Sequence, residues 1–407
     1  MTHPKMQYTY VGIDSHKDTH TAVFLDCFFE KLGEITFANL PSAFDEFLTN
    51  AQKFLNNDTA FMFGLEDISS YGRTLTVYLK QHGLQVKHVN ALLVARERKN
   101  QNVVQKTDSV DAECAARVLI SKFSELPDAD TQDMYWVLRS LVSRHYSLVK
   151  NRAASKKQLH SYITMHYPNY RQFFETIDGV TALAFFERYP SPGLLRNTTT
   201  EELTAFLQLT GKSYYTLDFA QRMLNTLQET AVEYQDFRDT VIQSTIRQIR
   251  FILKELDQLE EAMHIFLKKF DCTLTSMAGI DTVTAARMLA YIGDVRKFST
   301  PAKLARYAGI APVTYASGKK DAQYANERGN RQLNTLFFSL AVRVSFATGK
   351  IHKAINSFFY DYYNRKISEG KTKRQALKCV QRRLVNIVWG MLTNNEDYVN
   401  PPVIEVD

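Results

Sequence analysis

The sequence has few cysteines and no long apolar runs. Its four cysteines, Cys27, Cys114, Cys272 and Cys379, stand far apart and form no CxxC pair, so neither a zinc site nor a disulfide framework is expected. The longest mostly apolar stretches, such as residues 179–186, are far shorter than the roughly twenty residues that a membrane-spanning helix needs. The N-terminal ten residues contain no apolar signal region. We therefore expect a cytoplasmic protein with reduced thiols and no membrane partner.

Several motifs of common enzymes are also absent. The sequence contains no Walker A motif and no GxGxxG fingerprint, so nucleotide hydrolysis has no support. It contains no GxSxG elbow, which argues against a hydrolase of that type. We find no internal repeat.

What the chain does have is an uneven distribution of charge. It has 407 residues, 45% of them hydrophobic and 23% charged, which suggests two or three domains with real cores. Residues 296–390 contain 19 Lys and Arg but only 4 Asp and Glu, whereas the rest contains 31 basic and 39 acidic residues. A basic region of this kind favours a polyanion such as nucleic acid as its partner. A solvated basic surface is the alternative.

The first 130 residues alternate between strand and helix patterns. Residues 8–26 read as a β-hairpin whose first strand ends at Asp14, and further strands are expected near 34–38, at 59–66 and at 84–89. Helices are expected at 41–56, 71–82 and 107–121. This order predicts a mixed α/β domain over residues 1–130.

The strand pattern stops at about residue 130. Residues 131–270 are expected to form a helical linker, with a helix at 134–166, a loop at 189–200 and a heptad-like run at 241–270. That run suits a coiled coil or a long helical hairpin, and a helix buried in an ordinary bundle is the alternative.

The third part, residues 271–400, is expected to be helical. Residues 276–298 resemble a helix-hairpin-helix, in which backbone N–H groups contact DNA phosphates. A polar loop at 315–330 and a basic helix at 371–392 follow.

Four acidic residues form the first candidate site. Asp14 and Glu66 end two strands, and Asp108 and Asp111 project from one face of a helix. If the two strands are parallel neighbours, all four carboxylates can meet at one rim of the sheet. Their mutual repulsion would then call for Mg²⁺ or Mn²⁺, which can clamp a phosphodiester during displacement. The alternative is that each acid is a turn former or a cap, as Asp108 could be for its own helix.

Two further features are weaker. His16 and His20 are four residues apart, but in a tight turn this spacing does not place them on one face, so we do not expect them to bind a metal. Ser317 lies in the segment YASGKK beside Lys319 and Lys320, where positive charge could stabilise a developing oxyanion or hold a phosphate. An ordinary polar turn is the alternative.

Several basic residues are expected to contact the phosphate backbone of nucleic acid. They are Lys319, Lys320, Arg328, Arg331, Lys371, Lys373, Arg374 and Arg382. A solvated helix face remains the alternative for those in the last helix.

Taken in order, these motifs resemble the DEDD-type transposases of the insertion-sequence-110 family and the related Piv-type DNA invertases. The N-terminal segments are VGIDSHKDTH, GLEDISSYG and QKTDSVDAECAA. The C-terminal segments are SMAGIDTVTAARMLAYIGDVRKFSTPAKLARYAGIAPVTYASGKK, ERGNRQLNTLFF and GKTKRQALKCVQRRL. Together they cover both ends of the chain and about half its length.

The resemblance implies a RuvC-like, RNase H-type N-terminal domain, a coiled-coil spacer and a helical C-terminal transposase domain. It implies that Asp14, Glu66, Asp108 and Asp111 bind Mg²⁺ and that Ser317 is the nucleophile, forming a transient phosphoserine link to DNA. It further implies a composite site, a non-coding bridge RNA that pairs with target and donor DNA, and a homo-oligomer such as a dimer or tetramer.

The chain departs from the family pattern in three places. Asp67 and Ile68 follow Glu66 where the family has a small residue and then Thr or Ser. The stretch after Ser317 is less basic than usual, and Asn334 and Thr335 replace arginines. Residues 155–240 match no family motif, and one hypothesis is that they contact RNA.

The sequence thus indicates an RNA-guided DNA transposase or recombinase. Two other functions stay open. One is a metal-dependent DNA nuclease, like a junction resolvase, in which Ser317 is merely structural. The other is a non-catalytic nucleic-acid-binding derivative, which the intact carboxylates and Ser317 disfavour.

Overall fold

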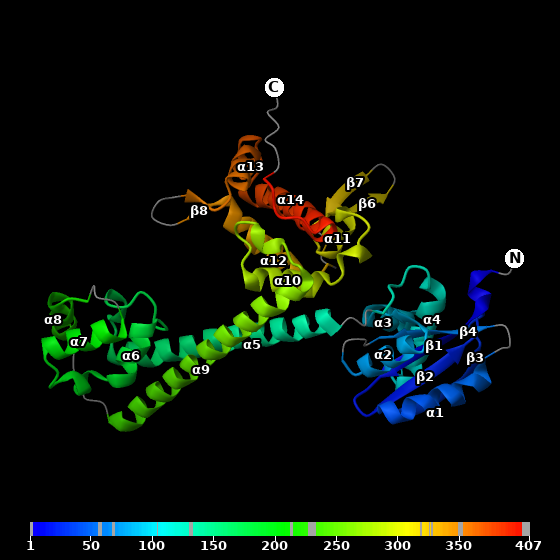
Figure 1. Ribbon diagram of the computed structural model, residues 1–407, viewed down its shortest axis with the longest axis horizontal. Helices are drawn as coiled ribbons and strands as arrows, with labels where there is room; N and C mark the ends of the chain where they lie inside the picture. Colours follow the sequence, from blue (N-terminus) through cyan, green and yellow to red (C-terminus); the bar gives the residue numbers. More distant parts are fainter. Residues whose placement is uncertain are drawn as a thin grey trace. The chain divides into compact units, whose positions relative to one another are not determined.

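The computed structural model describes most of the chain. The described residues are 3–55, 59–66, 70–103, 105–129, 133–211, 215–226, 233–317, 320–324, 326, 329–348 and 353–400. The chain forms two units, residues 1–136 and residues 137–407 (Figure 1). Each is described by itself below.

The first unit is built on a mixed sheet. Among the described residues its strands are β1 (Tyr8–Ser15), β2 (Thr19–Leu25), β3 (Lys31–Ala38), β4 (Ala60–Leu65) and β5 (Gln85–His88), in the order β3-β2-β1-β4-β5. The pairs β3-β2 and β2-β1 are antiparallel, whereas β1-β4 and β4-β5 are parallel. The expected mixed α/β domain is therefore confirmed.

Helices cover both faces of this sheet. They are α1 (Pro41–Ala51), α2 (Arg73–Gln81), α3 (Ala91–Asn100) and α4 (Asp108–Lys122), with 3-10 turns at Pro4–Gln7 and Gln52–Phe54. Alternate residues of the strands point to opposite faces. Val11 and Ile13 pack with the phenylalanines of α1, and Tyr10 packs with the alanines of α4. Only α3 was absent from the sequence prediction.

The second unit begins with two long helices, α5 (Asp133–His166, whose first residues belong to the first unit) and α9 (Gln235–Leu267). Leu148 packs against Ile252 and Leu256, and His145 Nε2 lies 3.1 Å from Glu260 Oε1. Further along, the C-terminal part of α5 shares a core with the N-terminal part of α9. The two helices therefore run antiparallel, as in the long helical hairpin that was one of the alternatives for the heptad-like run.

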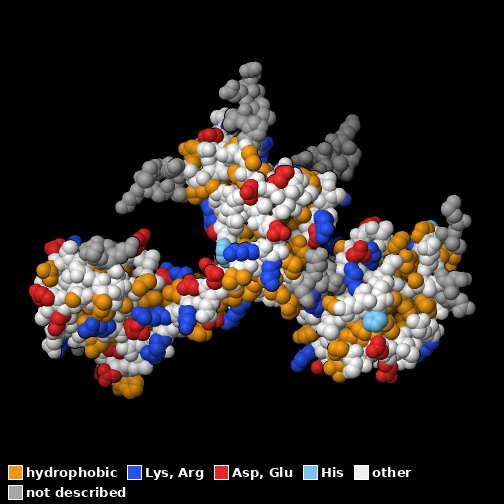
Figure 2. Space-filling model, in the orientation of Figure 1, with side chains coloured by type: hydrophobic (Ala, Val, Ile, Leu, Met, Phe, Trp, Pro, Cys, Tyr) orange, Lys and Arg blue, Asp and Glu red, His pale blue; other side chains and the backbone are white. Residues whose placement is uncertain are grey.

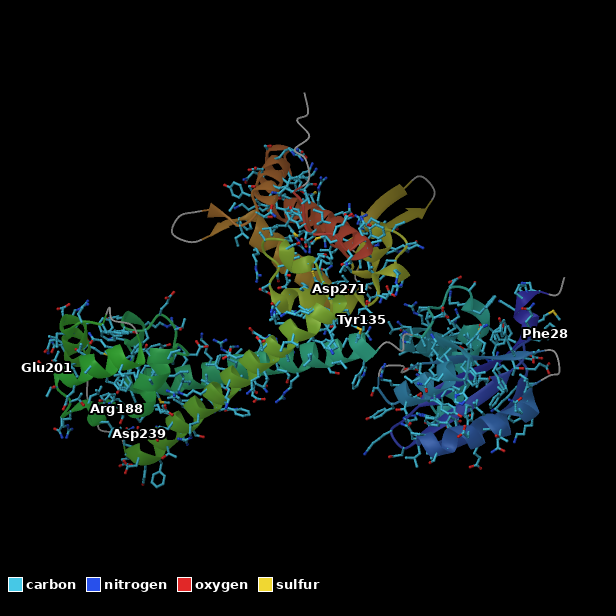
Figure 3. The ribbon with its side chains drawn as sticks, viewed as in Figure 1. Phe28, Tyr135, Arg188, Glu201, Asp239 and Asp271 are labelled. Atoms are coloured by element: carbon cyan, nitrogen blue, oxygen red, sulfur yellow. The ribbon has the colours of Figure 1, made fainter. Side chains whose placement is uncertain are left out.

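A small bundle lies between the distal ends of α5 and α9 (Figures 1 and 3). It contains α6 (Val180–Arg188), α7 (Thr200–Thr210) and α8 (Leu217–Asn225), with 3-10 turns at Tyr170–Gln172 and Pro192–Leu195. Its core is rich in aromatic rings, such as Phe185 and Phe186 at 5.3 Å between centroids. We call this part the tip bundle. The segment without family motifs therefore folds as a compact unit with its own core.

The remainder forms a second helical core. It contains α10 (Thr282–Ile292), α11 (Pro301–Tyr307), α12 (Arg331–Ser345), α13 (Ser357–Ser368) and α14 (Lys373–Asn394), with 3-10 turns at Lys268–Phe270, Leu274–Ser276 and Val295–Lys297. It also contains two β-hairpins, β6 (Val313–Ser317) with β7 (Lys320–Tyr324) and β8 (Ala347–Thr348) with β9 (Lys353–Ala354).

One expectation for this region was wrong, and the helix-hairpin-helix stays a prediction. Strands do occur after residue 130: the β6–β7 hairpin begins at Val313 and overlaps the polar loop expected at 315–330, and β8 pairs with β9. In the segment expected to resemble a helix-hairpin-helix, the first helix is a single 3-10 turn at Leu274–Ser276, followed by Gly279 with φ +104° and then α10. In the part of the chain that the structure describes, no helix is long and apolar enough to cross a membrane.

Candidate functional site

Asp14 is the next-to-last residue of β1, and Glu66 directly follows β4, the parallel neighbour of β1. Ile13 of β1 lies opposite Leu65 of β4, so the next residues along both strands are Asp14 and Glu66. Because side chains alternate, Asp14 points to the same face as Gly12, and that face packs against α4. The sequence argument depended on these two strands being parallel neighbours; they are, and both acids lie at the same edge of the sheet.

A glycine lets α4 approach this edge closely. A Cβ atom on Gly12 would lie 2.0 Å from the carbonyl oxygen of Ala112 and 2.3 Å from the nitrogen of Ala116. No other residue type allows that contact between strand and helix. The N-terminus of α4 is thereby held above the end of β1.

The first turn of α4 carries the other two acids. The helix is capped by Thr107, whose side chain accepts a hydrogen bond from the Val110 N–H at 3.3 Å. Thr107, and not Asp108, is therefore the N-cap. The alternative in which Asp108 caps its own helix is wrong. Asp108 is exposed and Asp111 is 9% exposed. Carboxylates are favourable in a first turn, where unpaired N–H groups give the helix a partial positive charge.

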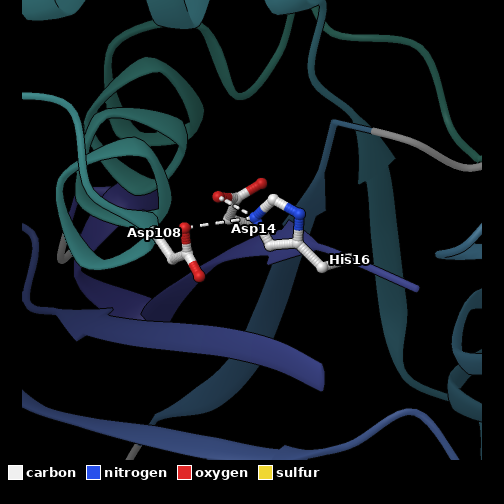
Figure 4. Close-up of side chains that lie close together, drawn as sticks. All are labelled: Asp14, His16 and Asp108. Carbon is white, nitrogen blue, oxygen red and sulfur yellow. Dashed lines mark hydrogen bonds and ion pairs between the residues drawn. The ribbon is translucent and has the colours of Figure 1, made fainter. Parts of the chain in front are cut away.

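His16 joins the cluster (Figure 4). Its Nε2 atom lies 3.1 Å from Asp14 Oδ2 and 3.2 Å from Asp108 Oδ1. Ligand atoms of Asp14, His16 and Asp108 all lie within 4.8 Å of one another, so these three could hold a metal ion. His20, by contrast, is buried, with its ring 5.4 Å from that of Phe37. The two histidines thus point to different places, as expected, but His16 belongs to the site.

The electrostatics of the cluster favour a cation. Burial raises the pKa of the Asp14 carboxyl; His16 opposes this shift, and the nearby Asp111 and Asp108 add to it. Burial lowers the pKa of His16, but attraction to Asp14 and Asp108 outweighs it, and the net shift is upward. Crowded carboxylates thus draw a positive charge toward them, which a metal ion could supply instead of a proton.

Asp111 already has a cationic partner. The guanidinium of Arg98, from α3, donates to Asp111 Oδ1, and Lys106 Nζ lies 4.0 Å from Asp111 Oδ2. Sequence reasoning missed Arg98 because it missed α3. The sequence contained one signal of this helix, its capping residue: Asn90 accepts a hydrogen bond from the Leu92 N–H at 2.8 Å.

The β6–β7 hairpin carries Ser317. Ser317 ends β6 and pairs with Lys320 across the turn. The backbone of the two strands is described, but Gly318, Lys319, Arg328 and the side chains of Ser317 and Lys320 lie outside the described residues.

Close backbone contacts hold the base of this hairpin. A Cβ atom on Gly329 would lie 2.2 Å from the nitrogen of Gly309. The Asn330 N–H donates to Tyr307 O at 2.7 Å, and Asn334 Nδ2 donates to Ala308 O and Gly309 O, each at 3.0 Å. Asn334, one of the departures from the family pattern, therefore fastens α12 to the segment leading into β6.

The basic residues expected to contact nucleic acid differ in their exposure and in their hydrogen bonds within the chain. Arg331, Lys373 and Arg374 are exposed, and Lys371 is half-buried. Arg382 donates to Pro301 O at 3.3 Å and to Asn386 Oδ1 at 3.0 Å, so it also joins α14 to the start of α11.

Two ranges of the chain match known families. Residues 11–168 match the DEDD transposases of IS110, and residues 272–356 match the transposase IS116/IS110/IS902 family. The chain belongs to the IS110 family of transposases. It is thus an enzyme of DNA strand cleavage and transfer.

Relatives of this transposase match along most of their length. It is 25% identical to the insertion element IS116 uncharacterized 44.8 kDa protein of Streptomyces clavuligerus, over 97% of each chain. It is 27% identical to the insertion element IS110 uncharacterized 43.6 kDa protein of Streptomyces coelicolor, over 81% of each. It is 23% identical to the pilin gene-inverting protein of Moraxella lacunata, over 97% of this chain and 98% of that protein.

The matched ranges include the carboxylate cluster and the β6–β7 hairpin of the transposase, but not the tip bundle beyond residue 168 or α9. The expected family is therefore confirmed.

Proposed function

We propose that this chain is an insertion-sequence transposase that cuts and rejoins DNA, with Ser317 as its nucleophile. Asp14, Glu66, Asp108 and Asp111 would bind Mg²⁺ or Mn²⁺. The observation that carries the proposal is the convergence of acids at one edge of the sheet, with Asp14 and Asp108 sharing His16 Nε2. Supporting it are the parallel register of β1 and β4 and the family match.

The proposed reaction is a phosphoryl transfer. The Ser317 hydroxyl oxygen attacks phosphorus and forms a phosphoserine bond, while the bond from phosphorus to one deoxyribose oxygen breaks. The hydroxyl proton passes to a base, and the leaving oxygen takes up a proton as an alcohol. In the rejoining step the hydroxyl of another DNA end attacks the phosphoserine and releases Ser317. The number of phosphodiester bonds is conserved, so no external energy source is required.

The donor set suits a hard divalent cation. Carboxylate oxygens are preferred ligands of Mg²⁺, and Mn²⁺ also accepts an imidazole nitrogen such as that of His16. A cation bound there would neutralise charge on the transferring phosphoryl group. Asp14 and Asp108 would orient the phosphate, and His16 and Arg98 would act as counter-ions of the acids before loading.

The partners follow from the charge distribution and the family. We propose DNA as substrate, a bridge RNA as guide and a homo-oligomer, a dimer or tetramer, as the active form. Lys319, Lys320, Arg328, Arg331, Lys371, Lys373, Arg374 and Arg382 would contact phosphates. In this proposal residues 1–130 are the RuvC-like catalytic domain, 131–270 the coiled-coil spacer and 271–400 the transposase domain, whose Gly279 turn plays the part of a helix-hairpin-helix.

A metal-dependent nuclease without a serine intermediate is the second candidate. It is favoured by one observation, namely that the acidic cluster is assembled within the first unit alone.

A covalent-adduct assay separates these functions. The purified protein is incubated with element-end DNA, the element RNA and Mg²⁺, and protein–DNA adducts are resolved on a denaturing gel. Wild type should form an adduct, whereas Ser317→Ala and Asp14→Asn should not. Matched controls are Ser147→Ala, an exposed serine of α5, and Asp18→Asn, an exposed acid in the turn after β1.

Each other result has a definite meaning. Cleavage without adduct that survives Ser317→Ala but fails in Asp14→Asn supports the nuclease. Adducts that persist in Ser317→Ala overturn the proposed nucleophile. Binding without cleavage under all these conditions supports the non-catalytic derivative.

A further inference from the structure

Two aromatic rings lie side by side on helix α13. The rings of Phe358 and Tyr362 are 6.3 Å apart between centroids, with 14° between their planes. The two residues are four positions apart, so their side chains share one face of the helix. Both are half-buried: they pack against the core of the second unit and keep part of their surface open to solvent. Figure 2 shows hydrophobic surface over α13, in the upper part of that view.

Cations surround these two rings. The guanidinium carbon of Arg383, from α14, lies 5.3 Å from the ring centroid of Phe358 and 5.7 Å from that of Tyr362. The guanidinium carbon of Arg365 and the Nζ atom of Lys366, both from α13, lie 5.3 Å and 5.5 Å from the Tyr362 centroid. The electron-rich face of an aromatic ring attracts a cation in such a position. We call Phe358, Tyr362 and Arg383 the aromatic platform.

Acids do not balance the positive charge of this surface. Residues 357–394, which form α13, α14 and the turn between them, contain eight Lys and Arg but only two Asp and Glu. One of these acids, Glu369, is already paired, since its carboxylate lies 2.7 Å from Lys366 Nζ. Arg383, by contrast, pairs with no carboxylate among the residues that the structure describes. The aromatic platform therefore combines ring surface with a cation that can attract an anion.

We propose that the aromatic platform binds an unpaired nucleobase of a single strand. The base stacks on the rings of Phe358 and Tyr362, and Arg383 contacts the phosphate next to it. A base inside a duplex is excluded, because its faces are covered by the neighbouring base pairs. The strand comes from one of two sources, the bridge RNA or an opened strand of the DNA substrate. The inference rests on the proposed function only in taking nucleic acid as the partner of this chain.

The chemistry of the aromatic platform favours a base over other occupants. An apolar partner would bury the charge of Arg383 without a counter-charge, which is costly. An acidic peptide would pair with Arg383 but leave the two rings without a planar partner. A nucleotide uses both parts, because its base has a face that stacks on aromatic rings and its phosphate pairs with a guanidinium. Stacking of this kind accepts any base, so we expect little sequence preference at this site.

Photocrosslinking of the full chain tests where an unpaired base lies. The probes are an RNA and a DNA strand of the same sequence, about twelve nucleotides long, which is within the usual site sizes of single-strand binding. Both contain 5-iodouracil, and EDTA is present so that no strand is cut. After irradiation, mass spectrometry should locate the crosslinked base on Phe358 or Tyr362. Crosslinks that fall only outside α13 overturn the proposal.

Fluorescence anisotropy with the same strands tests the part played by the rings. Tyr362→Leu removes the ring but keeps an apolar side chain. It should raise the Kd for a single strand about tenfold and leave the Kd for the matching duplex unchanged. Tyr362→Phe should bind like wild type, because it keeps the ring. Tyr360→Leu is the matched control, since Tyr360 is exposed on the same helix but outside the aromatic platform. Thermal unfolding checks that each variant is folded. An equal effect of Tyr362→Leu on single strand and duplex, or none on either, overturns the proposal.

The salt dependence of binding tests the part played by Arg383. Arg383→Gln should lower the slope of log Kd against log salt concentration by about 0.7, the value for one phosphate contact on a single strand. An unchanged slope overturns this contact. Tighter binding of RNA than of DNA supports the site with the bridge RNA as its source, and the reverse supports it with an opened DNA strand. All these measurements are made without metal, so a failed adduct assay with intact single-strand binding counts against the catalytic proposal only.

Discussion

Arg98 and Asp111 form an ion pair at the edge of the carboxylate cluster. The guanidinium belongs to α3 and the carboxylate to the first turn of α4, and both side chains are largely buried. A metal ion that binds Asp111 must therefore compete with Arg98. In the proposed metal site, this ion pair would stabilise the unloaded state and lower the affinity for metal.

The first prediction concerns this competition. Arg98→Gln should raise the affinity for Mn²⁺ about tenfold, which corresponds to about 1.4 kcal/mol. The reason is that the metal ion no longer has to displace the Arg98 guanidinium from Asp111. Isothermal titration calorimetry measures the change directly. Arg96→Gln, an exposed arginine of the same helix, should leave the affinity unchanged.

The same substitution should lower stability when metal is removed. In EDTA, Asp111 of Arg98→Gln is a buried carboxylate without its main partner, a loss that costs toward the lower end of about 3–5 kcal/mol. Mg²⁺ should restore most of it, because binding stabilises the folded state. Weaker metal binding in Arg98→Gln would show that Arg98 supports the site instead of competing for it.

A second prediction follows from the contact between Gly12 and α4. Gly12→Ala places a methyl group within 2.3 Å of backbone atoms of α4, which cannot move aside without leaving the sheet. We expect a loss of more than about 3 kcal/mol in the stability of the first unit, in the range of severe core substitutions. Urea unfolding followed by circular dichroism measures it. Gly390→Ala, where no atom lies near, should stabilise α14 by up to about 1 kcal/mol.

Much of this site could be predicted from the sequence, because the features that place the acids lie within a few residues of them. The acids end strands that have a clear pattern, and Thr107 marks the start of α4. His16 was not predicted, because its contact with Asp108 joins residues 92 positions apart and depends on how closely α4 approaches β1. Arg98 was missed because α3 has a weak apolar pattern, with Val94 as its buried residue.

The hairpin of Ser317 was misread for a related reason. Its strands have five residues each, VTYAS and KDAQY, which is too short for the period of their apolar residues to distinguish a strand from a loop. What defines them is distant: Gly309 meets Gly329, and Asn334 reaches back to Ala308. A sequence pattern indicates which side of one helix or strand is buried. It does not indicate contacts between distant segments, such as those that hold the base of this hairpin.

A third prediction tests that base. Gly329→Ala should push the two backbones apart and displace the hairpin, so adduct formation should fall at least tenfold while the helical core stays folded. The adduct assay together with thermal unfolding checks both parts. Gly193→Ala, which has open space around it, is the control. Normal adduct yield in Gly329→Ala would show that catalysis tolerates movement of the hairpin.

The last prediction concerns Asp178 in the tip bundle. Its side chain is buried and accepts hydrogen bonds from Arg152 at 2.8 Å and Lys156 at 2.7 Å. Burial acts to raise the pKa of Asp178, but the two cations outweigh it, and the net shift is downward from 3.8. A lowered pKa adds stability above the unfolded value, and this stability is lost as the pH falls through the folded value.

Asp178→Asn should therefore destabilise the tip bundle by about 3 kcal/mol at pH 7, because it leaves two cations without their carboxylate. The difference from wild type should shrink below pH 4, because the carboxyl of unfolded wild type takes up a proton there, before that of the folded protein. Calorimetry at a series of pH values follows the difference, and hydrogen exchange at pH 7 assigns it to the tip bundle. Asp218→Asn is the control, since the Asp218–Arg222 pair is exposed and should matter by less than about 0.5 kcal/mol. A difference that stays constant from pH 7 to pH 3 would mean that Asp178 acts through packing and not through its charge.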